Sequence, residues 1–296
     1  MNDDRPVSVA GSRLPTINHL QLAVLSALLC GLLAVGSQLG PVGLLVAVAV
    51  VQAILIPSWV LGTGLPGRIG ALVIGTLAAG GADAATMHWH HSGYSPVLGV
   101  LGLAVPVMFV HQLTRGVVRT RVVESMAAIA VLVVGVVALA GLLVLRRQAS
   151  GSTITLALTA AIGLGLLVNH LTDAALPAPR FDPTVDRGLP AVLAGLVAGG
   201  LVGLLLLRNV IDFAGGRGTF LGAAVAAVAC LLSIGASFAE SREPVFTGRA
   251  GLGPAVTALP PEVPSRLARL RPAAAVALTI ALTAPAAYVL TNALTG

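Results

Sequence analysis

The segment 171–188 holds most of the side chains that could carry metal or phosphate chemistry. It contains three aspartates and two arginines, in a chain otherwise rich in Ala, Leu, Val and Gly: Asp173, Asp182, Asp186, Arg180 and Arg187. Carboxylates are the ligands that Mg²⁺ prefers, and a guanidinium pairs well with phosphate oxygens. The segment could be a catalytic loop, the remains of one, or a polar connector between two helices.

His170 lies just before this segment and adds a possible proton acceptor. It is three residues from Asp173, so on a helix the two side chains share a face. Such a pair could act as a general base with its orienting carboxylate, or it could be a hydrogen-bonded helix end. The prolines that follow, Pro177 and Pro179, indicate that a helix stops near Asp173.

A second polar group surrounds Asp83, a carboxylate inside an apolar run and therefore a functional candidate. Three histidines follow it: His88, His90 and His91. Clustered histidines can bind Zn or Cu, but Trp89 beside them is typical of the membrane interface, where such rings are half apolar and half hydrated. Asp83 with these histidines could also serve a proton or ion relay.

The elements that must position these residues are transmembrane helices. The chain has 296 residues, of which 56% are hydrophobic and 9% charged, and its mean hydropathy is +0.97. A soluble protein of this length needs more charge to cover its surface. Apolar runs of about 20 residues, enough to cross a bilayer, predict an all-α polytopic bundle of about nine spans. They are 19–38, 42–63, 68–87, 94–113, 122–145, 152–171, 188–207, 216–238 and 272–294.

The arginines predict the orientation. All 17 basic residues are arginine, and the net charge is +6. If the N-terminus is cytoplasmic, 13 of the 17 fall on inside segments, as the positive-inside rule requires. We therefore expect a cytoplasmic tail at 1–18, one transmembrane domain at 19–296, and polar cytoplasmic loops at 172–187 and 239–271. The localisation expected is the plasma membrane, and a nucleic-acid partner is not expected.

Two further features bear on partners. Gly195, Gly199 and Gly203 recur every four residues, which lets another helix approach closely, either within the chain or across a homodimer. Arg266 and Arg269 stand directly before the last span, where basic side chains attract anionic lipid headgroups at roughly 1 kcal/mol each. Membrane lipids, and a membrane-protein partner or a second copy, are the expected partners.

Four places along the chain together resemble one enzyme family. Asp173 lies at the inner end of the sixth predicted span, and 181–188 (FDPTVDRG) leads into the seventh. Residues 236–241 (ASFAES) and 265–268 (SRLA) follow the eighth span and precede the last. In order and spacing, over residues 94–295, this layout resembles the phosphatidate cytidylyltransferases. That family has a span-ending aspartate, a Ser-Pro-Lys-Lys-Thr-type stretch, a Gly-Asp-Leu-x-Glu-Ser pattern and an Asp-Arg-Leu-Asp pattern at these places.

The resemblance implies a scaffold whose relatives make CDP-diacylglycerol from CTP and phosphatidic acid, and the departures imply lost chemistry. Both lysines are missing from 181–188, and family aspartates are replaced by Ser237, Ser265 and Ala268. The reaction needs Mg²⁺ to screen the triphosphate, and Mg²⁺ needs carboxylates. Arginine replaces a lysine at a phosphate only with different geometry. The chain is therefore identified as a degenerate member, a pseudoenzyme with no cofactor expected.

Three functional hypotheses follow. The first is a catalytically inactive membrane protein that binds anionic lipid or a membrane partner at its cytoplasmic face, with phosphate contacts from Arg180, Arg187, Arg266 and Arg269. The second is an active, divergent lipid nucleotidyltransferase. In it Asp173 and Asp186 would be catalytic, and Mg²⁺ would be held by Asp173, Asp182, Asp186 and Glu240. The third is a small ion or proton-coupled transporter that uses Asp83 and the outer histidines His88, His90 and His91.

Overall fold

A computed structural model of the protein describes residues 18–65, 67–89, 93–115, 122–176, 178–182, 185–214, 216–246 and 265–295, without the side chains of 241–246 and 265–266. Residues 1–17 of the predicted tail, most of the loop 239–271, and His90 and His91 lie outside these residues. Within them the fold is all-helical, apart from an isolated bridge between Asp182 and Val185.

Nine spans among the described residues are long and apolar enough to cross a membrane, which confirms the predicted fold class. They are α1 (His19–Gln38), α2 (Gly40–Gly62), α3 (Arg68–His88), α4 (Ser95–Thr114), α5 (Val122–Leu139) continued by α6 (Gly141–Leu145), α7 (Gly151–Ala175), α8 (Leu189–Leu207), α9 (Arg217–Phe246, apolar to Glu240) and α12 (Arg271–Thr295). Two short helices, η1 (Ile211–Phe213) and α11 (Ser265–Ala268), flank α9 and α12.

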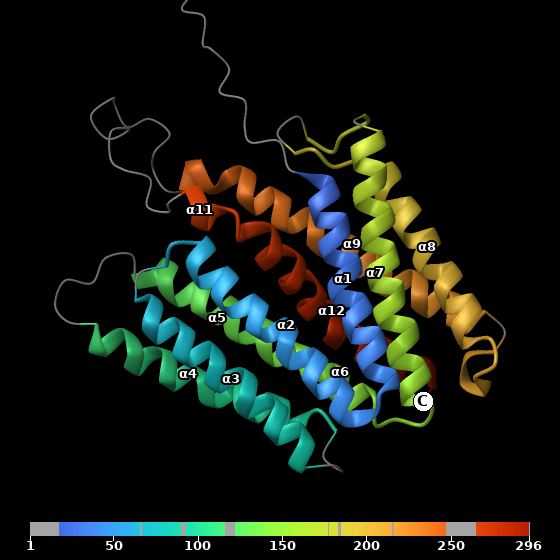
Figure 1. The fold of residues 1–296 in the computed structure, drawn as a ribbon, viewed down its shortest axis with the longest axis horizontal. Coiled ribbons are helices and arrows are strands. Elements are labelled where there is room, and N and C mark those ends of the chain that lie inside the picture. Colours follow the sequence, from blue (N-terminus) through green and yellow to red (C-terminus); the bar gives the residue numbers. More distant parts are fainter. Residues whose placement is uncertain are drawn as a thin grey trace, which may run out of the picture.

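The helices form two groups joined by α12 (Figure 1). Helices α2, α3, α4 and α5 pack together on one side, and α1, α7, α8 and α9 pack on the other. Helix α12 lies between the groups and contacts α9, α2 and α5. Because successive spans alternate in direction, α1 begins where α7 ends. We call this end of the bundle the Arg187 end, and the opposite end, where α4 begins, the Tyr94 end.

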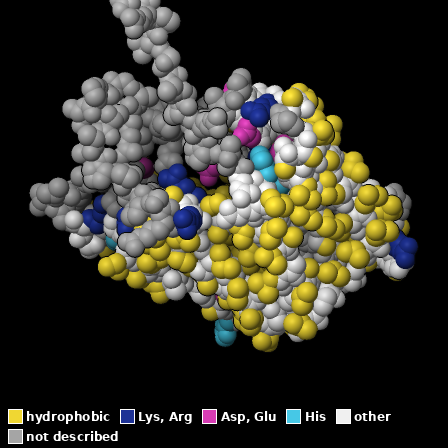
Figure 2. All heavy atoms as spheres, turned by 45° about the horizontal axis from the view of Figure 1, so that its top comes forward, with side chains coloured by type: hydrophobic (Ala, Val, Ile, Leu, Met, Phe, Trp, Pro, Cys, Tyr) yellow, Lys and Arg dark blue, Asp and Glu magenta, His cyan; other side chains and the backbone are white. Residues whose placement is uncertain are grey.

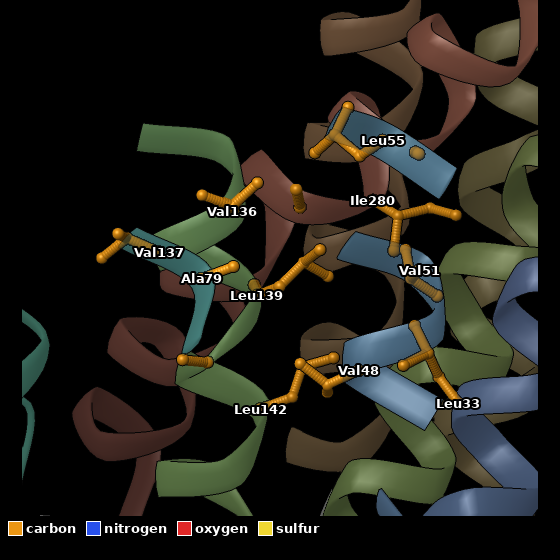
Figure 3. Packing of buried hydrophobic residues seen from close by; sticks show 14 of the residues in the cluster. Leu33, Val48, Val51, Leu55, Ala79, Val136, Val137, Leu139, Leu142 and Ile280 are labelled. Carbon is orange, nitrogen blue, oxygen red and sulfur yellow. The ribbon is translucent and has the colours of Figure 1, made fainter. Parts of the chain in front are cut away.

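The core lies where α1, α2, α5, α6 and α12 meet (Figure 3). Leu33, Val51, Leu139, Leu142 and Ile280 point toward one another there and are almost fully buried. Lipid tails are as apolar as these side chains, so close packing rather than exclusion of water holds such helices together. The bundle is therefore a tightly fitted scaffold on which polar side chains can be held in fixed positions.

The glycine strip of α8 is used inside the chain. A Cβ added at Gly195 would lie 2.7 Å from the Cys230 sulfur of α9 and 2.8 Å from the Gly165 carbonyl oxygen of α7. A Cβ at Gly199 would lie 2.7 Å from the Gly222 carbonyl oxygen. The absence of side chains thus lets α8 approach α7 and α9 closely, and the internal-packing interpretation of this strip is confirmed.

The surface separates by polarity (Figure 2). Hydrophobic side chains cover most of the visible lateral face, and most charged side chains in this view gather beside the grey segments. The lateral face includes large exposed residues such as Leu28, Val73, Phe109 and Leu205. Such a belt suits contact with lipid tails, so polar function is expected at the ends of the bundle or in its interior.

Candidate functional site

A buried polar cluster at the Arg187 end gathers around the Arg187 guanidinium, whose side chain is only 2% exposed. From α7, Asp173 Oδ2 accepts a hydrogen bond from Nη1 at 3.0 Å, and Asn169 Oδ1 accepts one at 3.3 Å. From α9, Ser237 Oγ accepts from Nε at 3.1 Å and Ser233 Oγ accepts from Nη2 at 3.0 Å. Arg187 therefore joins the ends of two spans.

Helical spacing explains why these partners face one place. Asn169 and Asp173 are four residues apart on α7, as are Ser233 and Ser237 on α9, so each pair shares one helix face. Arg187 approaches from the segment between α7 and α8. The Phe181 amide donates to the Arg187 carbonyl oxygen at 2.9 Å, which closes this segment on itself over the cluster.

Both oxygens of Asp173 are engaged. Oδ2 binds the Arg187 guanidinium, and Oδ1 accepts the backbone N–H of Gly188 at 3.0 Å. Gly188 is the residue that precedes α8. Asp173 therefore fixes both the side chain and the backbone that lead into the next span, and it is 7% exposed as a residue.

His170 faces the same guanidinium. Its Nδ1 lies 2.7 Å from Arg187 Nη1. Because a guanidinium only donates, Nδ1 is the acceptor and the ring proton is assigned to Nε2. The His19 ring of α1 lies 6.2 Å from the His170 ring, between centroids. The predicted pair of His170 and Asp173 is thus brought together, with both side chains bound to Arg187.

Burial sets the electrostatics of the cluster. It lowers the pKa of the Arg187 guanidinium below its usual value, and the hydrogen bond and charge of Asp173 offset only part of that effect. A buried charge is tolerated when it is paired and hydrogen-bonded, although desolvation can exceed the attraction. Arg187 and Asp173 thus neutralise each other inside the protein, at a cost in desolvation. Arg187 was predicted to contact phosphate, but its guanidinium is not exposed at the surface.

The other acidic residues of the predicted metal site lie apart. Asp186 pairs with Arg180 at 2.7 Å, with both side chains more than one-third exposed. Asp182 forms the bridge to Val185, and Glu240 is exposed on α9. Among the described residues, no three His, Cys, Asp or Glu side chains are grouped so that they could hold a metal ion. The four predicted Mg²⁺ ligands are therefore not gathered in this structure.

The arginines near the start of the last span have different surroundings. Arg269 is exposed, and the side chain of Arg266 lies outside the described residues. Arg271 donates from Nε to the Gly62 carbonyl oxygen at 3.0 Å and so ties the start of α12 to the end of α2. Of these arginines, Arg269 is the one whose side chain the structure shows as exposed.

Asp83 lies in a separate polar site nearer the Tyr94 end. Its Oδ1 accepts a hydrogen bond from Gln52 Nε2 of α2 at 3.2 Å, and the same amide donates to the Val136 carbonyl oxygen at 3.0 Å. His88 closes α3 and packs edge-on against Trp89, with ring centroids 5.2 Å apart. The structure therefore connects Asp83 to Gln52 and Val136 of neighbouring spans.

Ser233 and Gln52 are the residues that sequence reasoning missed. Ser233 stands one helical turn before Ser237, so a search for polar residues four apart inside apolar runs would have found it. Gln52 is an isolated amide in α2, and its importance follows only from the packing of α2 against α3. Comparison with protein-family models, with curated proteins and with solved structures gives no match to this chain.

Proposed function

We propose that the protein is a catalytically inactive member of a phosphatidate-cytidylyltransferase-like scaffold that binds anionic lipid headgroups at its Arg187 end. The observation that carries this proposal is the contact of Arg187 with Asp173 and Ser237. These are three positions that the sequence resemblance identifies as functional in that family, and here they bind one another.

The convergence of these positions supports the scaffold. Asp173 lies in the last turn of α7, Arg187 belongs to the following loop, and Ser237 lies 50 residues further along the chain, on α9. An active site built from the family's span-ending aspartate, lysine-rich stretch and second aspartate requires these places to meet in space. Their contact in this structure is the arrangement that such a scaffold requires.

The contents of the cluster support inactivity. A magnesium-dependent transfer from CTP needs carboxylates for the metal and free cations for the triphosphate. Here the oxygens of Asp173 are taken by Arg187 and Gly188, and the second aspartate position is the neutral Ser237. The guanidinium is itself neutralised by Asp173. The cluster offers neither net negative charge to a metal nor an open cation to phosphate.

The exposed arginines support lipid binding. Arg180 and Arg269 are exposed at this end of the bundle, and the arginine distribution along the sequence predicts that this end is cytoplasmic. The pair of Arg180 with Asp186 is exposed, and such pairs contribute only about 0–1 kcal/mol. A lipid phosphate can therefore replace Asp186 as the partner of Arg180 at little cost.

Lipid titration tests this function. The variant R180Q/R269Q should bind phosphatidylglycerol roughly thirtyfold more weakly, since it removes two basic residues and each one near an anionic surface contributes about 1 kcal/mol. The measurement is the uptake of labelled phosphatidylglycerol by the full-length protein in detergent micelles. The matched control R208Q/R217Q removes the same charge from the Tyr94 end and should bind like the wild type. Equal loss in both variants would contradict binding at the Arg187 end.

A further inference from the structure

A groove on the α3–α4 side of the bundle forms a second polar site at the Arg187 end. It has a volume of about 630 Å³ and opens to the surface between the turn after α2 and the end of α4. Its lining includes Gly67, Arg68, Ile69, His111, Thr114 and Arg115. Neither the buried cluster nor the exposed arginines of the lipid-binding proposal belong to it.

Nitrogen atoms from α4 and from the residue that follows it converge on the start of α3. Gly67 precedes α3 with φ of +77°, a conformation that favours glycine. A Cβ placed there would lie 3.2 Å from Arg115 Nε and 3.2 Å from His111 Nε2. Two side-chain nitrogens thus lie over the same point of the backbone, and a side chain at residue 67 would press against both.

The groove also contains polar groups that have no hydrogen-bond partner among the described residues. His111 Nε2 is buried and has no hydrogen-bond partner among them. Gly67 gives α3 no side-chain cap, so the amides of the first turn lack that partner. Arg115 donates from Nη1 to Gln112 Oε1 at 2.8 Å, which fixes one side of its guanidinium and leaves the other toward the groove.

We propose that this groove binds a phosphate group. Arg68 and Arg115 supply two guanidinium groups, and guanidinium is the side chain best matched to phosphate oxygens. The backbone amides at the start of α3 add donors with the favourable end of the helix dipole. The arginines, the histidine nitrogen and the uncapped amides come from separate parts of the chain and meet at one opening.

The surroundings favour a lipid as the source of the phosphate. Ile69 lines the groove and is 81% exposed, and Leu113 of α4 is 63% exposed. Exposed apolar residues continue along both helices: Val73, Leu77, Phe109 and Val110. A headgroup in the groove would leave its acyl chains beside this face. The choice of a lipid rests on the proposed lipid-binding function, whereas the phosphate site rests on the groove itself.

Native mass spectrometry of the full-length protein tests the site with probes that differ by one group. Dioleoyl phosphatidic acid and dioleoylglycerol share their tails and differ in the phosphate. The wild type should retain phosphatidic acid and release dioleoylglycerol, and R68Q/R115Q should weaken retention of the first phosphatidic acid at least about tenfold, through loss of two charge-assisted contacts. The single variant R68Q, which removes a side chain without hydrogen bonds among the described residues, should show a smaller loss without a change in thermal stability.

The outcomes separate the site from the lipid-binding function. If R68Q/R115Q retains phosphatidic acid at the wild-type level, the groove is not the site. If R180Q/R269Q then loses phosphatidic acid, lipid binding elsewhere at the Arg187 end is still supported. Millimolar inorganic phosphate is the third probe. If it binds the wild type and not R68Q/R115Q while phosphatidic acid does not bind, the phosphate site stands and the lipid-binding function fails.

Discussion

Arg187→Met should lower the free energy of unfolding by about 3–5 kcal/mol, because it leaves the Asp173 carboxylate buried without its counter-ion. The substitution removes the ion pair to Asp173 and the hydrogen bonds to Ser233 and Ser237, while methionine retains much of the volume. Unfolding by SDS in mixed micelles, followed by circular dichroism, measures the loss. A companion variant, Arg180→Met, breaks an exposed pair and should cost at most about 1 kcal/mol.

A double variant tests whether the cost comes from the unpaired charge. Asp173→Asn removes the charge and keeps an acceptor for the Gly188 amide. R187M/D173N should therefore be more stable than R187M alone, since replacing both members of a buried pair is often nearly neutral. If the losses of unfolding free energy are strictly additive, so that the double variant is less stable than either single variant, the two charges do not stabilise each other.

Gly199→Leu should destabilise the bundle by about 1–3 kcal/mol or more, the usual cost of forcing side-chain volume into a packed interface. Even a Cβ at this position would collide with the Ala226 side chain and lie 2.7 Å from the Gly222 carbonyl oxygen. Helices in a membrane associate through such close contacts, so moving α8 from α9 weakens their association. The same SDS titration measures the effect.

Gly235→Leu is the matched control for this substitution. Gly235 lies on α9, and a Cβ there would meet nothing within 4 Å. It should lower stability by less than about 0.5 kcal/mol, as for most surface changes. Equal losses for Gly199→Leu and Gly235→Leu would indicate that leucine acts through the helix itself and would remove the close contact between α8 and α9 as the explanation.

The spans were predictable because a bilayer fixes both the length and the polarity of a crossing helix. Predicted and observed ends agree within a few residues for most spans. The sixth was predicted to end at 171, yet α7 continues to Ala175. The reason is the cluster: Asn169, His170 and Asp173 look like the polar end of a span, but Arg187 satisfies them inside the protein, so the helix continues past them.

The candidate site was predictable in part. The residue types singled out Asp173 and Arg187 separately, and the sequence supplied no reason to pair them. Their contact depends on the path of the loop between α7 and α8, which returns the side chain of residue 187 to the end of α7. The groove between α3 and α4 could not be predicted from the sequence. Arg68 and Arg115 are two of the 13 arginines on the segments predicted to lie inside, and their convergence depends on how α3 packs against α4.

The Arg187 cluster is expected to be catalytically inactive, and an assay of CDP-diacylglycerol synthesis measures this. The full-length protein, purified in mixed micelles with phosphatidic acid, is supplied with CTP and Mg²⁺, and CDP-diacylglycerol is measured. No product above the protein-free background is expected, for the wild type and for D173N alike. Formation of CDP-diacylglycerol by the wild type, abolished in D173N, would contradict it.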